Sequence, residues 1–97
     1  MPLHNELTEA ERLAETLGLI LGAASCCEEV TEERLNSLVP QLQRLVLATA
    51  DDRADAEAAN ERFSVAIDAG RTAAENGKID PEDAEAALTE VETQLAI

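Results

Sequence analysis

The sequence predicts an all-α fold, a small antiparallel bundle of three to four helices. Apolar residues recur at alternating steps of three and four along most of the chain, which is the period of one helix face. Acidic residues lie almost wholly off these apolar stripes, so each helix has an apolar side and a polar side. No segment shows the strict alternation that is typical of a strand.

The length of 97 residues predicts one helical domain, which we place at residues 8–97, after a flexible tail at residues 1–7. Leu, Val, Ile and Ala must form the core, because the sequence has one Phe, no Trp and no Tyr. Small side chains bury little apolar area, and a domain of this size has a marginal core. We therefore predict that a homodimer completes the bundle.

The first helix is expected to begin after Thr8, because Thr8 and Glu11 have the spacing of a capping box. One face of this helix carries the main apolar stripe, formed by Ala10, Leu13, Leu17, Ile20, Ala24 and Cys27. The opposite face of its second half carries a second stripe, formed by Leu19, Gly22, Ala23 and Cys26. A helix that is apolar on all sides is normally buried on all sides, so residues 17–27 are expected to lie at the centre of the bundle or at a dimer interface. The second stripe is the predicted oligomer interface.

Thr31 is a good N-cap residue, and the apolar period that follows it continues to Ala73 in one register. Two interpretations stay open for residues 31–76. They form one long central helix against which the shorter helices pack, or Asp51 and Asp52 cap a new helix.

Proline and glycine mark the remaining helix boundaries. Pro40 removes a backbone donor and is expected to kink its helix, unless a new helix begins there. Asn76 and Gly77 are expected to end the helix before them, with glycine in the left-handed conformation. Asp80 as the cap and Pro81 in the first turn predict the start of the last helix.

The charge of the chain is strongly unbalanced, with 21 acidic and seven basic residues and a formal net charge of −14. Such a surface repels phosphate and anionic lipid, so we expect no direct binding to nucleic acid or to a membrane. It attracts a basic surface on a partner protein. The predicted partner-binding face is formed by clustered acids, namely Glu28, Glu29, Glu32, Glu33, Asp51, Asp52, Asp55, Glu57 and Glu61.

Cys26 and Cys27 are candidates for a redox pair or for ligands of a soft metal. They are expected to end a helix, where the negative end of the helix dipole and Glu28 and Glu29 disfavour the thiolate that either role needs. The sequence offers no second cysteine pair and no histidine cluster to complete a tetrahedral site. This pattern favours structural packing, and we predict no metal and no cofactor.

Two further motifs do not predict catalysis or metal binding. His4 is the single histidine and lies in the predicted tail, with no Ser or Cys near it in sequence. Residues 76–83 match the second half of a calcium-binding loop, but its first ligand positions fall on Thr72 and Ala74, which supply no carboxylate. We therefore name no catalytic residue and expect no enzyme activity.

These observations predict a non-enzymatic acidic helical module, an adaptor or regulator, that engages a basic surface of a partner protein. One alternative is a nucleic-acid mimic, such as an anti-defence protein, whose carboxylates imitate phosphates and block a DNA- or RNA-binding complex. A second alternative is a thiol or metal site at Cys26 and Cys27. We expect a cytoplasmic protein, because no apolar run is long enough to span a bilayer and two adjacent cysteines form no disulfide framework.

Overall fold

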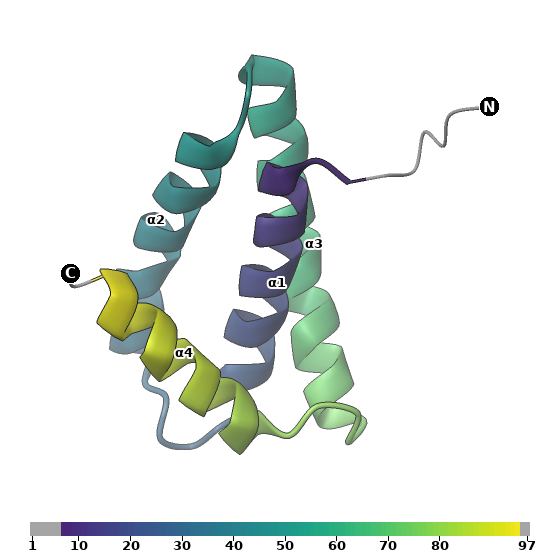
Figure 1. The fold of residues 1–97 in the computed structure, drawn as a ribbon. Helices are drawn as coiled ribbons and strands as arrows, with labels where there is room; N and C mark the ends of the chain where they lie inside the picture. The colour runs from purple at the N-terminus through teal and green to yellow at the C-terminus, as the bar shows by residue number, and fades with distance from the viewer. Residues whose placement is uncertain (1–6, 96–97) are drawn as a thin grey trace.

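The computed structural model describes residues 7–95 and is all-helical in this range. Four helices follow one another along the chain (Figure 1): α1 Glu9–Ala24, α2 Glu32–Thr49, α3 Arg53–Glu75 and α4 Pro81–Leu95. The predicted all-α class is confirmed. Residues 1–6, which make up most of the predicted tail and include His4, lie outside the described residues.

The main helix contact joins α1 and α3, which lie side by side and run in the same direction, with α2 antiparallel to both (Figure 1). The two backbones touch at glycines. A Cβ atom added at Gly22 would lie 2.9 Å from the backbone N of Arg71, and one at Gly70 would lie 2.9 Å from the backbone carbonyl C of Leu19. Any side chain at these two positions would push the helices apart.

The core lies between α1, α2 and α3, and α4 closes it at one end. Its largest fully buried side chains are Phe63, Leu42, Leu88 and Val46. The buried residues of each helix follow the three-four period that the sequence shows. Leu45 of α2 is an exception, because it continues this period but is 36% exposed.

Residues 31–76 form two helices, so the alternative of one long central helix is wrong. Ala50 has extended backbone, with φ −68° and ψ 142°. The Asp52 side chain accepts a hydrogen bond of 2.8 Å from the Asp55 backbone N–H and caps α3. The continuous apolar register did not reveal this break, because the turn is only three residues long.

The first two helices begin as their sequences predict. The Thr8 hydroxyl accepts from the Glu11 N–H at 3.1 Å, while the Glu11 carboxylate accepts from the Thr8 N–H at 3.1 Å, which completes a capping box. The Thr31 hydroxyl accepts from the Arg34 N–H at 3.1 Å and caps α2. These caps set where each helix starts relative to its neighbours.

Proline and glycine act differently in this fold. Pro40 lies on the exposed side of α2, and the helix continues through it, so no new helix begins there. Gly77 has φ +75°, the left-handed conformation that ends α3. Asp80 accepts a hydrogen bond of 3.0 Å from the Glu82 N–H at the start of α4. The expected terminator and the expected cap are both confirmed.

Candidate functional site

The nine acids of the predicted partner-binding face lie in two groups at opposite ends of α2 (Figure 1). The first acidic group, Glu28, Glu29, Glu32 and Glu33, lies at the α1–α2 connection and is exposed. The second acidic group, Asp51, Asp52, Asp55, Glu57 and Glu61, lies at the α2–α3 connection and along the first half of α3. Because α2 is about 27 Å long, the two groups do not form one continuous surface.

The first acidic group gains neighbours from α4. Glu28 and Glu29 line a shallow hollow of about 320 Å³ together with Asp80 and Glu82. These α4 acids were not predicted to belong to this face, because some fifty residues separate them from the α1–α2 connection. The start of α4 therefore extends the negative surface at this end of the molecule.

The second acidic group includes residues that the fold itself uses. The Asp55 carboxylate accepts from the Thr8 hydroxyl at 2.6 Å and from the Asp51 backbone N–H at 3.0 Å. The Thr8 hydrogen bond, followed by that of Asp51, lowers the pKa of Asp55. Asp52 caps α3, so Glu57 and Glu61 are the members of this group whose side chains stand clear of the turn.

The four residues of the predicted oligomer interface are only partly accessible. Gly22 lies against the backbone of α3, and Ala23 has no exposed surface. Leu19 and Cys26 are half-buried, and the Cys26 thiol donates to the Arg71 carbonyl with an S···O distance of 3.8 Å. Within the described residues, a second chain could therefore reach Leu19 and Cys26, while contacts inside one chain cover the other two.

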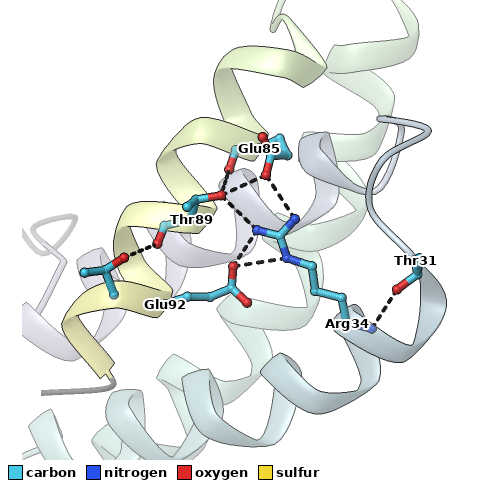
Figure 2. Close-up of polar contacts among 6 residues, drawn as sticks. Thr31, Arg34, Glu85, Thr89 and Glu92 are labelled. Carbon is cyan, nitrogen blue, oxygen red and sulfur yellow. Dashed lines mark hydrogen bonds and ion pairs between the residues drawn. The ribbon is translucent and has the colours of Figure 1, made fainter.

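The most connected polar cluster joins the start of α2 to α4 (Figure 2). The Arg34 guanidinium donates to Glu85 at 3.0 Å and to the Thr89 hydroxyl at 3.0 Å. Its Nε donates to Glu92 Oε1 at 3.1 Å, and one Nη makes a further short contact with the same oxygen. Thr89 in turn donates to Glu85 at 2.8 Å, so the partners also hold one another in place.

The contacts of this cluster shift the pKa values of Arg34 and Glu85. Glu92, as a hydrogen-bond acceptor, is the main cause of the raised pKa of Arg34. The Thr89 hydroxyl first, and Arg34 second, lower the pKa of Glu85. The cluster was not predicted from the sequence, although Glu85 and Glu92 are seven residues apart and so share one edge of α4.

A second arginine, Arg62, lies on the side of α3 next to α1 and links the two helices. The Arg62 guanidinium lies 3.7 Å from a carboxylate oxygen of Glu11 and 3.4 Å from one of Glu15. Both carboxylates belong to α1, so these ion pairs lie beside the glycine contact of the two helices. Arg34 and Arg62 are therefore both paired with carboxylates of neighbouring helices.

The two cysteines line the hollow at the start of α4 that is described above. Both Cys26 and Cys27 are free and half-buried. Among residues 7–95, no three His, Cys, Asp or Glu side chains come together in a group that could hold a metal ion. Cys27 packs against the hydrophobic core, whereas Cys26 faces the carbonyl of Arg71 on α3.

Comparisons of the chain with protein-family models, with curated proteins and with solved structures give no match. None of the helices in residues 7–95 combines the length and the apolar character needed to cross a membrane.

Proposed function

We propose that this chain is a non-enzymatic, acidic helical module, an adaptor or regulator, that engages a basic surface of a partner protein. The observation that carries the proposal is that most of the acidic side chains are exposed. The described carboxylates are exposed except for a few half-buried ones, and each of these has a polar partner within the chain. They are Glu11, Glu15, Asp55, Glu85 and Glu92.

The cations of the chain do not balance the exposed acids. Arg34 and Arg62 bind carboxylates of neighbouring helices, and Arg53 lies 3.6 Å from Glu57 in an exposed pair on α3. A partner surface rich in Lys and Arg would be attracted over a Debye length of about 10 Å, which raises the rate of association. The acidic surface is therefore suited to fast, salt-sensitive binding.

Affinity capture from an extract of the source cells tests this function, at low salt and at about 500 mM salt, where screening is strong. The baits are the native chain and two variants with glutamines in place of the acids at opposite ends. One variant changes Glu28, Glu29, Glu32 and Glu33, and the other changes Glu57 and Glu61. We expect one basic protein to bind at low salt, to be released at high salt, and to be lost from one variant. Equal capture by all three baits, or no salt-sensitive partner, would overturn the proposal.

A row of carboxylates along α3 favours nucleic-acid mimicry as a second candidate. Glu57, Glu61, Asp68 and Glu75 are all exposed, and the helix rise spaces them by about 6 and 10 Å along one side. We call these four residues the α3 carboxylate row. Duplex DNA or RNA added to the capture assay separates the candidates, because it displaces the partner of a mimic and leaves another basic partner bound.

A further inference from the structure

The side of α3 that faces away from the core carries apolar residues that the fold does not use. The buried residues of α3 are Ala59, Phe63, Ala66 and Gly70. On the other side, Val65 is 62% exposed, the largest exposed fraction among the large hydrophobic side chains described. Small exposed residues continue this stripe above and below Val65, and together they form what we call the α3 outer face: Ala54, Ala58, Val65, Ala69 and Thr72.

The surface around Val65 is hollowed on both sides. One shallow hollow of about 290 Å³ is lined by Ala58, Glu61, Arg62 and Val65, with Glu11 of α1. Another, of about 460 Å³, is lined by Val65, Ala69, Thr72 and Ala73, and also by Asp68, Asn76 and Lys78. Because the stripe has no side chain larger than valine, a second helix could approach α3 closely along its length.

The α3 carboxylate row lies beside this stripe on one edge. Glu61 precedes Val65 by four residues, Asp68 follows it by three, and Glu75 follows Thr72 by three, so each carboxylate neighbours the stripe on the helix surface. The other edge is bounded by Arg62, which is held by Glu11 and Glu15 of α1. The α3 outer face is thus apolar along its centre and acidic along one edge.

We infer that the α3 outer face docks an amphipathic helix of a partner protein that has a small apolar stripe edged on one side by Lys or Arg. This inference rests on the proposed function and names the surface and the kind of partner. The apolar stripe supplies burial, and the α3 carboxylate row fixes the direction and register of the incoming helix through its basic edge.

A second copy of this chain that docks antiparallel on the same face meets like charge. Pairing two α3 helices antiparallel about a two-fold axis at Val65 would set one carboxylate row beside the other. Like charges in contact would then oppose the pair, in addition to the repulsion between two chains of net charge −14. The charge pattern therefore favours a basic partner over self-association.

The test uses a synthetic helical peptide with an Ala/Leu stripe and lysines along one edge, titrated into the ¹⁵N-labelled chain and followed by NMR. A second peptide of the same composition, with the lysines spread around the helix, is the control. We expect the first peptide to shift the amide signals of α3 around Ala58, Val65 and Ala69, and the second to bind more weakly. Shifts that map elsewhere, or equal binding of both peptides, would overturn the inference.

Two variants separate the apolar and charged parts of the contact. Val65→Ser should weaken binding of the first peptide, which has its lysines along one edge, about fivefold to tenfold. The reason is that it removes the apolar surface that docking buries. Glu61→Gln with Asp68→Asn should weaken it about threefold to tenfold and reduce its salt dependence. The matched control is Leu47→Ser with Glu90→Gln, at exposed positions of α2 and α4, which should bind as the native chain does.

Capture with the Val65→Ser bait distinguishes failure of this inference from failure of the proposed function. If the native chain and Val65→Ser capture the same salt-sensitive basic protein equally well, the α3 outer face is not the docking surface, and the proposed function stands. If neither bait captures such a protein, the proposed function itself fails. Loss of the partner from Val65→Ser alone supports the inference.

Discussion

At the scale of single residues, polar contacts between distant segments hold this small bundle in register. Arg34 illustrates this, because its planar guanidinium binds Glu85 and Glu92 at once, which a lysine ammonium could not match in geometry. Ala84 and Leu88 are the buried residues of α4, so this cluster supplements a limited apolar contact. The polar cluster around Arg34 therefore contributes to holding α4 against α2.

Glu85→Gln should destabilise the chain at pH 7, and the destabilisation should disappear in acid. The pKa of Glu85 is lower in the folded chain than in the unfolded one, so its carboxylate stabilises the fold above the ordinary pKa of 4.5. That contribution is lost as the pH falls through the lowered pKa. Urea unfolding of both proteins between pH 7 and pH 2 measures the difference. Glu90→Gln, at an exposed position of α4, is the control, and a pH-independent difference would contradict this account.

The sequence predicts local contacts at this scale and misses the distant ones. Thr8 with Glu11, and Thr31, were identifiable because a capping side chain and the backbone N–H that donates to it lie within three residues. The pairing of Arg34 with Glu85 spans 51 residues, and sequence spacing alone cannot show which helices become neighbours. The structural use of Asp55, which was predicted to face a partner, was missed for the same reason.

At the scale of helices, the approach of α1 to α3 depends on backbone atoms as much as on side chains. Gly18 and Gly22 of α1 and Gly70 of α3 are all buried at this contact. A Cβ atom at Gly18 would lie 2.6 Å from the Cβ of Ala66. Apolar periodicity predicted that the second half of α1 is surrounded, but it could not say whether the neighbour belongs to the same chain.

Gly22→Ala should destabilise the chain by about 1–3 kcal/mol, because the added methyl group overpacks the contact with α3. In an exposed helix the same change stabilises by about 1 kcal/mol, so the sign of the effect reports the contact. Urea unfolding measures it, with Thr16→Ala on the exposed side of α1 as a control that should change stability by less than about 0.5 kcal/mol. A stabilising Gly22→Ala would show that the helices are further apart.

The break between α2 and α3 shows why the course of α3 was not predictable. While residues 31–76 could be one helix or two, the direction of the chain after Thr49 was undefined. Asp52 caps α3, which then runs back along the molecule. The length of α2 separates the two acidic groups under either interpretation, so the break decides only that α3 lies antiparallel to α2.

At the scale of the whole molecule, charge and shape act together. The described fold measures 44 × 31 × 17 Å, which is thin for a helical bundle and leaves the outer side of α3 without a covering helix. A net charge of −14 is distributed over this thin body. The negative field of the chain opposes self-association and favours binding to a basic partner. Because salt screens this field, added salt should strengthen self-association and weaken binding to basic partners.

The predicted homodimer should therefore form more readily as salt increases. Light scattering at about 20 mM and about 500 mM NaCl, where the Debye length is about 20 Å and about 4 Å, should give a larger mass at the higher concentration. Leu19→Glu should remain monomeric at both concentrations, since Leu19 and Cys26 are the accessible members of the predicted interface. A monomeric mass for the native chain at both salt concentrations would contradict the predicted homodimer.

The placement of Phe63 has a practical consequence for all of these measurements. Phe63 is the one aromatic side chain, it is 1% exposed, and it lies where α3 meets the core. The chain has no tryptophan or tyrosine, so ultraviolet absorbance near 280 nm does not report its concentration. A single fluorinated phenylalanine would instead give one ¹⁹F resonance from the centre of the core, a spectroscopic probe that follows folding without any engineered label site.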